Sequence, residues 1–309
     1  LFRDKSLTFA KNLNAHDMKK FILSILAIAA MASCTKTSED DVDPNVPVEI
    51  KLGGSITALS KAAVTTNTFT AQVASSGITN NYTTSLWSGT DAGKINVNNG
   101  SVTFTQTEYY PNDGGTVYMK GFAPQATINA GQVAYTISGK EDIMVTSEIS
   151  GSRTDNTNKE LTFNHLLTQL KFKLVAEDAD AITYWGSITS ITVKNVEKDL
   201  VLKLNTGELS IATTSNKGDL EVSEEFTSKA LTTTPAENGY IMVLPSTTAY
   251  VLNIKTAENT QGVDVTISPV VTVKGTAHEI TLTFKRSEIA SSAKTTPWTT
   301  GDPGSGEVK

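Results

Sequence analysis

The fold is decided by residues 94–104, KINVNNGSVTF. Apolar and polar residues alternate on both sides of Asn99-Gly100, which is the pattern of two half-buried β-strands. Asn-Gly favours the two-residue turn of a β-hairpin, because both residues tolerate a positive φ. The stretch therefore predicts an antiparallel hairpin.

The same period of two recurs along most of the chain after residue 48. A second hairpin is predicted where 201–204 is followed by the turn residues 205–207 and then by Leu209 and Ile211. Further strand-like segments are 48–52, 170–174, 240–244, 250–254 and 280–284. No window has a sustained helical period with caps. The sequence predicts an all-β protein, built of sandwiches or barrels with short strands.

One polar stretch divides this strand-rich region. Residues 151–159, GSRTDNTNK, contain no apolar side chain and predict a linker. We therefore expect an N-terminal β-sandwich at 48–157 and a C-terminal β-sandwich at 158–290. The remaining residues, 291–309, are rich in Ser, Thr, Gly and Pro and predict an extended or loosely ordered tail.

Residues 18–34, MKKFILSILAIAAMASC, have the pattern of an export signal. Two lysines precede an apolar run at 21–31, which is shorter than the roughly 20 residues that a membrane-spanning helix needs. The run fits the apolar region of a secretory signal peptide instead. Ala32-Ser33-Cys34 resembles a bacterial lipobox, and this resemblance implies lipidation of the Cys34 thiol. A buried helix with a free cysteine is the alternative, but nothing amphipathic surrounds the run.

Three segments before residue 48 are therefore predicted to lie outside the folded part. Residues 1–17 are interpreted as an upstream extension that is not part of the mature protein, and 18–33 as the lipoprotein signal peptide. Residues 34–47 contain four clustered carboxylates and predict an acidic, disordered linker. This cluster also resembles the tag that directs Bacteroidetes lipoproteins to the outside of the outer membrane. The two interpretations are compatible, and both fit an outer-membrane lipoprotein at the cell surface.

The charge and the motifs exclude several classes of function. The net charge is −6, and Lys and Arg form no cluster, so binding to nucleic acid is disfavoured. The chain has no phosphate-binding loop, no dinucleotide glycine pattern and no G-x-S-x-G elbow. Cys34 is the only cysteine, so no intrachain disulfide can form. We expect neither a cofactor nor an enzymatic activity.

The candidate metal ligands are few and badly spaced. His16 precedes the predicted start, and His165 lies in a predicted strand, where a structural role is favoured. His278 is followed by Glu279 but lacks the second histidine of a helical metal motif. The acidic residues of 177–180 could contact calcium, but their spacing does not match an EF-hand, and a solvated turn is favoured. No metal site is predicted.

Three aromatic residues leave a binding function open. Tyr109, Tyr110 and Trp87 could form a platform for sugar rings, or they could fill the core of a sandwich. The first interpretation gives an alternative function, a surface glycan-binding lipoprotein of a sugar-uptake system. Such a protein is expected to stay monomeric.

The chain also resembles a known family. Residues 161–174, LTFNHLLTQLKFKL, resemble the F-x-H-x-x-x-x-L-x-F-x-L strand of the Bacteroidetes fimbrillin-like proteins. Residues 280–284, Trp298 and the Gly-rich residues 301–308 resemble the ending of the same proteins. Together with Cys34, this resemblance implies a subunit of a type V pilus that contributes to adhesion. It also implies two transthyretin-like, Greek-key β-sandwiches in tandem.

The resemblance further implies a mode of assembly. In this family a trypsin-like protease cuts just past the first strand, and a segment of a neighbouring subunit fills the groove that is left. Here 48–61 is the removable first strand, and the candidate cut lies between Lys61 and Ala62, where the family more often has Arg. An ordinary loop lysine that is never cut is the alternative. The partners expected are other pilin subunits, the outer membrane through Cys34, and a host or bacterial surface receptor.

The donated segment is the remaining question of this scheme. Either the tail 291–309 or the segment 48–59 could be donated, and the resemblance favours the tail. The physical argument does not depend on the family. A sandwich that loses a strand exposes unpaired backbone groups and an apolar furrow, which another chain can fill by pairing.

Overall fold

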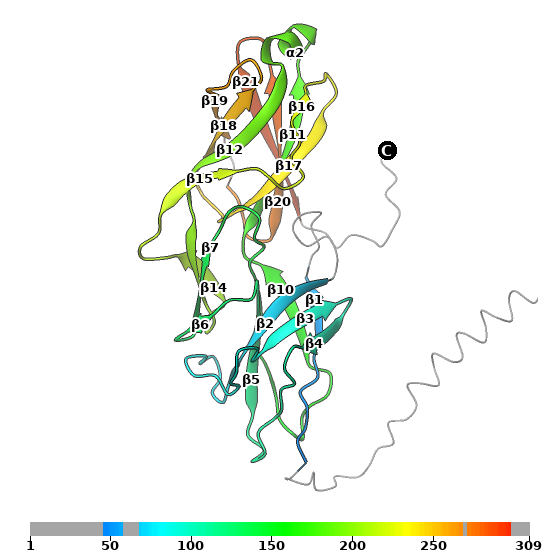
Figure 1. The fold of residues 1–309 in the computed structure, drawn as a ribbon, viewed down its shortest axis with the longest axis vertical. Helices are drawn as coiled ribbons and strands as arrows, with labels where there is room; N and C mark the ends of the chain where they lie inside the picture. The colour runs from blue at the N-terminus through cyan, green and yellow to red at the C-terminus, as the bar shows by residue number, and fades with distance from the viewer. Residues whose placement is uncertain (1–45, 58–67, 268–270, 298–309) are drawn as a thin grey trace, which may run out of the picture. The chain divides into compact units, whose positions relative to one another are not determined.

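The computed structural model describes residues 46–57, 68–267 and 271–297. In these residues nearly all regular structure is β-strand, arranged in four sheets, with one short helix (Figure 1). The prediction of an all-β fold is confirmed. The alternation of apolar and polar residues produces it, because successive side chains of a strand point to opposite faces of the sheet.

The largest sheet contains the N-terminal strands. Its strands, in spatial order, are β2 (Thr68–Ser76), β3 (Lys94–Asn98), β4 (Ser101–Phe104), β1 (Gly53–Ile56), β10 (Glu160–His165), β8 (Met144–Thr146), β5 (Val117–Ala123) and β9 (Ile149–Gly151). An additional pairing joins β2 to β5. The path from β2 through β1 to β5 is therefore closed on itself, as in a barrel.

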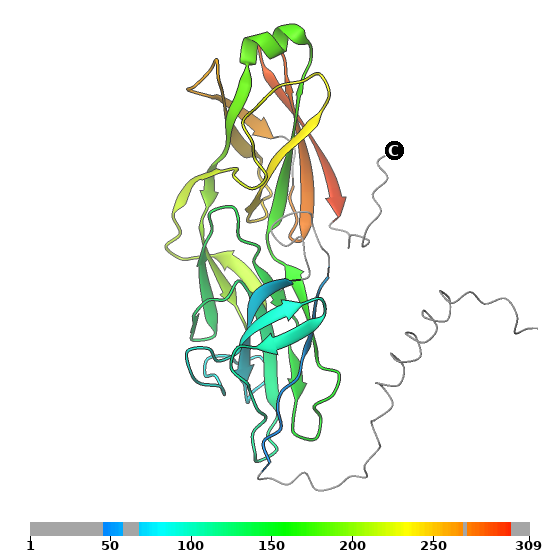
Figure 2. The same cartoon turned by 45° about the vertical axis from the view of Figure 1, so that its right-hand side comes forward.

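Two further sheets face each other and form a β-sandwich. The first contains β17 (Ala236–Val243), β11 (Thr168–Ala176), β20 (Thr276–Phe284) and β21 (Ile289–Pro297). The second contains β15 (Lys217–Glu221), β12 (Ser187–Glu197), β18 (Tyr250–Thr256) and β19 (Val263–Ile267), and β16 (Lys229–Ala230) pairs with β12. Buried side chains of β11 and β20 pack with those of β12 and β18 in one hydrophobic cluster. Figure 2 shows the two sheets on either side of this core, with the helix at one end.

The fourth sheet combines strands from both parts of the chain. Its strands are β14 (Glu208–Ile211), β13 (Asp199–Lys203), β7 (Gln132–Thr136) and β6 (Ile128–Asn129). The polar stretch 151–159, predicted as a linker, mostly forms the loop between β9 and β10, which belong to one sheet. Strand pairing therefore crosses the boundary expected near residue 157, and the division into 48–157 and 158–290 stays a prediction.

Both predicted hairpins are present. The strands β3 and β4 pair antiparallel, and the turn residues Asn99 and Gly100 have φ values of 47° and 91°. The strands β13 and β14 form the second hairpin, in which Leu202 pairs with Leu209. Turn chemistry decided both elements, because Asn and Gly adopt a positive φ at little cost.

Two local expectations need correction. The residues 177–180 do not form a simple turn, because Asp178 caps the helix α2 (Ala179–Trp185) by accepting a hydrogen bond from the Ala181 N–H at 2.8 Å. A short acidic cap followed by few apolar residues gives no periodic signal in the sequence. The strand β21 continues to Pro297, beyond residue 290, where the tail was expected to begin.

Candidate functional site

The candidate site is the first strand and the groove that holds it. The strand β1 lies between β4 and β10, where it pairs parallel with β10 from Gly53–Glu160 to Ile56–Phe163 and antiparallel with β4 at Gly53. Figures 1 and 2 both show β1 (blue) beside the β3–β4 hairpin (cyan). Since no pairing joins β4 to β10 among the described residues, β1 completes the closed path of the sheet. Its removal would leave two unpaired strand edges.

Backbone hydrogen bonds hold the segment from 48 to 57 along its length. The N–H groups of Gly53, Gly54 and Thr57 donate to carbonyl groups of both neighbouring strands or their ends. Upstream, the chain pairs antiparallel with residues 108–110. The bonds are Gly53 N to Lys159 O (2.8 Å), Gly54 N to Gly100 O (3.1 Å), Thr57 N to Phe163 O (2.9 Å), Ile50 N to Glu108 O (2.8 Å) and Tyr110 N to Val48 O (3.0 Å).

Alternate, apolar side chains of this segment belong to the core. Ile50, Leu52 and Ile56 are buried, and Ile50 is only 1% exposed. They pack in a cluster with residues of the other strands of the sheet, among them Phe163. Burying one such side chain contributes about 1.5–3 kcal/mol relative to leaving it exposed. An empty groove would therefore be apolar as well as unpaired.

A glycine allows the close approach of β1 to its neighbours. A Cβ atom added to Gly54 would lie 2.7 Å from Val102 Cγ2 and 3.3 Å from Val97 Cγ1. Glycine inside a strand weakens it, and it often marks a place where another part of the chain approaches closely. Here the contact with the β3–β4 hairpin explains the glycine.

Polar contacts fix both ends of the segment. At its beginning, the guanidinium of Arg153 donates to the Val46 carbonyl at 2.8 Å. At its end, the Thr57 hydroxyl lies 3.0 Å from the Phe163 carbonyl and 2.6 Å from Asn164 Oδ1. These contacts lie outside the apolar middle, so they hold the ends of the strand without adding to its hydrophobic core.

A buried carboxyl group lies beside the upstream pairing. Glu108 is 4% exposed and accepts a hydrogen bond from the Gly93 N–H at 3.0 Å. Burial raises the pKa of Glu108 above its ordinary value, although the bond from Gly93 opposes this. Gly93 has a φ of 69°, and an added Cβ would lie 2.1 Å from the Val73 carbonyl oxygen, so a larger residue cannot replace it without a shift of the backbone.

The residues that the sequence predicted as processing sites cannot be placed. Cys34, Lys61 and Ala62 lie outside the described residues, as do the tail residues 298–309. The last residue described before the candidate cut is Thr57, at the end of β1. In the part of the chain that the structure describes, no helix has the length and apolar character needed to cross a membrane.

The two histidines among the described residues, His165 and His278, are buried in the fold. His165 Nδ1 lies 2.8 Å from Asp142 Oδ1, and both side chains are buried. His278 is buried in β20, where desolvation lowers its pKa. No group of three or more His, Cys, Asp or Glu residues suited to a metal ion occurs among the described residues.

The aromatic residues do not form a shared platform. Trp87 and Tyr110 are buried, and Trp87 packs edge-on against Phe104 with ring centroids 5.6 Å apart. Tyr109 alone of the three is exposed, at 48%. The platform interpretation is therefore wrong for Trp87 and Tyr110, because each side chain fills a core.

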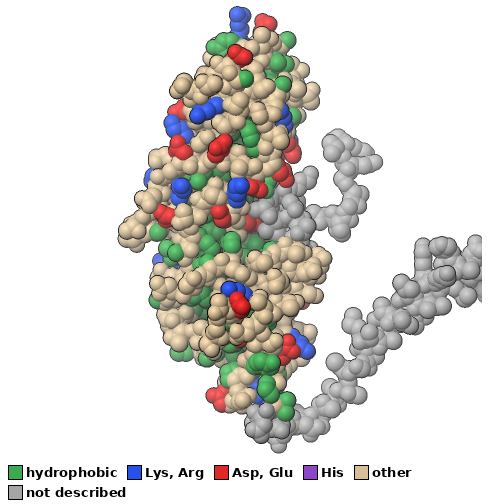
Figure 3. All heavy atoms as spheres, in the orientation of Figure 1, with side chains coloured by type: hydrophobic (Ala, Val, Ile, Leu, Met, Phe, Trp, Pro, Cys, Tyr) green, Lys and Arg blue, Asp and Glu red, His purple; other side chains and the backbone are tan. Residues whose placement is uncertain are grey.

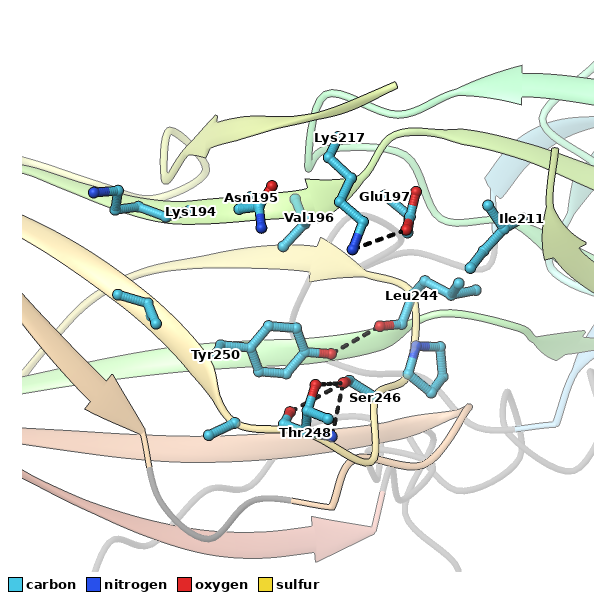
Figure 4. Close-up of a pocket in the computed structure, with 13 residues that line it drawn as sticks. Lys194, Asn195, Val196, Glu197, Ile211, Lys217, Leu244, Ser246, Thr248 and Tyr250 are labelled. Atoms are coloured by element: carbon cyan, nitrogen blue, oxygen red, sulfur yellow. Dashed lines mark hydrogen bonds and ion pairs between the residues drawn. The ribbon is translucent and has the colours of Figure 1, made fainter. Parts of the chain in front are cut away.

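A separate groove of about 520 Å³ lies between β12, β15 and the loop that joins β17 to β18 (Figure 4). Lys217 Nζ lies 3.2 Å from Glu197 Oε1, and the Tyr250 hydroxyl donates to the Leu244 carbonyl at 2.7 Å. These groups are thus satisfied within the chain. On the face drawn in Figure 3, basic and acidic side chains are interspersed, so this face offers a partner no large surface of one charge.

Sequence reasoning missed Arg153, Gly54 and Glu108. Arg153 is one of only three arginines in the chain, and it lies in a stretch without apolar residues. A rare, long cation in a polar loop is a signal that could have been noticed. The Gly53-Gly54 pair inside an alternating segment is a second such signal.

The fold and the site together define an all-β protein in which the first described strand, β1, lies between β4 and β10 and closes a sheet. The model of the fimbrillin-like family matches residues 61–298, and the chain belongs to this family. No curated protein matches.

Two solved structures show the same fold. One is a candidate cell adhesion protein from Bacteroides uniformis ATCC 8492, with 18% sequence identity, a TM-score of 0.60, and coverage of 84% of this chain and 100% of that chain. The other is a candidate cell adhesion protein from Bacteroides ovatus ATCC 8483, with 14% identity, a TM-score of 0.57, and coverage of 83% and 100%.

Proposed function

We propose that this chain is a subunit or accessory component of a type V pilus and that it assembles by donor-strand exchange. It is exported as a lipoprotein, anchored in the outer membrane through Cys34 and displayed at the cell surface. Cleavage between Lys61 and Ala62 frees the first strand, and a segment of a neighbouring subunit replaces it. The position of β1 between β4 and β10 is the observation that carries this proposal.

The geometry supports exchange for a physical reason. Departure of β1 would leave unpaired N–H and C=O groups on two strands and would uncover the apolar contacts of Ile50, Leu52 and Ile56. An extended segment can satisfy both, since main-chain hydrogen bonds give affinity and alternate side chains give register. Such a contact joins two different surfaces, so repetition builds an open filament.

The tail is the favoured donor. Its first residues, 291–297, belong to β21, which is an edge strand paired with β20 among the described strands, and residues 298–309 follow. An edge strand has one free side, so the chain that leaves it can extend toward another molecule. We further propose two tandem β-sandwich domains. The adhesion role comes from the two structural neighbours and from the family. We propose no catalytic role and no cofactor.

Limited digestion tests the proposal. The full chain carrying Cys34→Ser is incubated with trypsin, and the products are followed by mass spectrometry and electron microscopy. We expect a cut after Lys61, a resistant core and then filaments. Lys61→Gln should block both the cut and the filaments, whereas Lys51→Gln, at an exposed lysine upstream of β1, should block neither. Filaments from uncut Lys61→Gln protein, or a clean cut that yields only monomers, would contradict the proposal.

A further inference from the structure

Arg153 makes a buried contact with the beginning of the segment 46–57, which contains β1. The Arg153 side chain is buried, with 4% of the residue exposed. Its Nη2 donates to the Val46 carbonyl at 2.8 Å, and its Nη1 donates to Asn112 Oδ1 at 2.8 Å. The guanidinium therefore connects the segment before β1, at Val46, with the segment that pairs with 48–50, at Asn112.

The register shows what this bridge replaces. Glu49 pairs with Tyr109, and the Tyr110 N–H donates to the Val48 carbonyl at 3.0 Å. In a regular antiparallel ladder the next donor to this strand would be residue 112, opposite Val46. The Arg153 guanidinium takes that place, held by the Asn112 side chain. It extends the ladder by one step.

The loop that carries Arg153 is itself held in place. The backbone of Ser152 and Asp155 forms reciprocal hydrogen bonds of 2.9 and 3.2 Å. The Asn156 side chain donates to the Arg153 carbonyl at 2.8 Å, and Lys159 pairs with Asp155 at 2.8 Å. These contacts do not involve the segment 46–57. The backbone that carries Arg153 is thus fixed by contacts within its own loop, and Asn112 Oδ1 also holds the guanidinium, so less order must be gained when a strand binds.

We propose that Arg153 is a positioning residue for whichever strand fills the groove beside β4 and β10. It binds a main-chain carbonyl, not a side chain, so it recognises the first strand of its own chain and an extended segment of a second copy alike. This rests on the proposed function only for the second copy. Arg153 sets where the strand begins, because it binds the Val46 carbonyl, two residues before the Val48 carbonyl that accepts the hydrogen bond from Tyr110.

An exchange experiment tests this role. The full chain with Cys34→Ser receives a recognition site for a sequence-specific protease within residues 58–67, so that the cut does not depend on Lys61. After cutting, replacement of the first strand by a labelled synthetic peptide of residues 44–60 is followed by fluorescence anisotropy. Arg153→Met, which keeps an unbranched apolar stem, should speed the loss of the strand at least about tenfold, as expected for a lost hydrogen bond to a charged group. Arg286→Met, at an exposed arginine, should change nothing.

A chemical change in the peptide separates anchoring from a general structural role. In a second peptide a thioamide replaces the Val46 carbonyl, and sulfur is the weaker acceptor. This peptide should bind the normal chain more weakly than the first peptide does, and the difference should vanish in Arg153→Met. If that variant fails to fold, the comparison of the two peptides on the normal chain decides alone.

The outcomes distinguish the two proposals. Equal affinity of both peptides for the normal chain, or equal exchange in Arg153→Met and the normal chain, would overturn the anchoring role. Exchange that depends on Arg153 would support it even if the cut protein never formed filaments. That last result would overturn only the pilus proposal.

Discussion

The strands β1 and β11 have similar neighbours in their sheets but pair with them over very different lengths. Both β1 and β11 lie between two neighbours, one parallel and one antiparallel. The strand β1 is four residues long and touches β4 at a single pair. The strand β11 is nine residues long and pairs with β20 from Gln169 to Ala176. The first strand therefore has a short pairing with each neighbour, whereas the second has long pairings on both sides.

The two strands should differ in the free energy of local opening, because β11 must lose more contacts at once than β1. Proteins open locally with free energies that range from near zero to the global free energy of unfolding. The strand β1 has few ladder bonds and two glycines, so it should need less free energy to open than β11 does, although the buried Ile50 and Leu52 just before it oppose opening. Opening β11 would break two long ladders and uncover the sandwich core. We therefore expect β1 to open without the rest.

The largest expected effect is on β11. Phe172→Ala removes a side chain that is 1% exposed in the sandwich core, and such changes cost about 3–5 kcal/mol. Chemical denaturation should show this loss in the free energy of unfolding of the whole molecule. Ile211→Ala, at a side chain exposed on β14, is the matched control and should cost less than about 0.5 kcal/mol. A loss of less than about 1 kcal/mol in the free energy of unfolding for Phe172→Ala would show that β11 contributes little to the stability of the core.

A smaller and local effect is expected on β1. Gly54→Ala places a Cβ 2.7 Å from Val102 Cγ2, and overpacking of this kind costs about 1–3 kcal/mol. Hydrogen exchange should accelerate in residues 53–57 and stay unchanged in β11. Gly77→Ala is the control, because its added Cβ would have only Leu86 Cδ2 nearby, at 3.8 Å. Equal acceleration in β1 and β11 would mean that the two strands open as one unit.

The sequence predicts local structure such as hairpins and strands well, but it does not predict which distant strands pair. Asn99-Gly100 predicted a hairpin because turn chemistry is local, and the alternation of Leu170, Phe172 and Leu174 predicted a half-buried strand. The same alternation says nothing about partners. That β1 pairs parallel with β10, more than 100 residues away, follows from the whole fold.

The candidate site was predictable in outline only. The family resemblance predicts 48–61 as a removable first strand, and the alternation of Ile50 and Leu52 fits the burial of these two side chains. The role of Arg153 was not predicted, because a polar stretch such as 151–159 predicts a linker even when one of its side chains is buried. Its partner is a backbone carbonyl, which has no sequence signature. Main-chain recognition is therefore the part of this site that single-sequence reasoning misses.

The smallest effect expected is an opposite response of the two regions to acid. Burial lowers the pKa of His278 in β20 below 6.5, so the unfolded state binds the proton more readily and stability falls as the pH drops below 6.5. Burial raises the pKa of Glu108 above 4.5, so the folded state binds the proton more readily and stability rises as the pH falls toward 4.5. Mild acid should weaken β20 and strengthen the pairing of residues 48–50 with 108–110.

Hydrogen exchange of paired variants at each pH isolates the two groups, because the intrinsic exchange rate cancels in the comparison. Glu108→Gln keeps an oxygen acceptor for the Gly93 N–H and should remove the gain at 48–50 without affecting β20. His278→Gln should remove the acid-induced loss in β20 and leave 48–50 as before. If Glu108→Gln instead weakened 48–50 equally at every pH, the carboxyl group would act by packing and not by titration. The pairing of residues 48–50 with 108–110 would then be equally strong at neutral and mildly acidic pH, and only β20 would respond to acid.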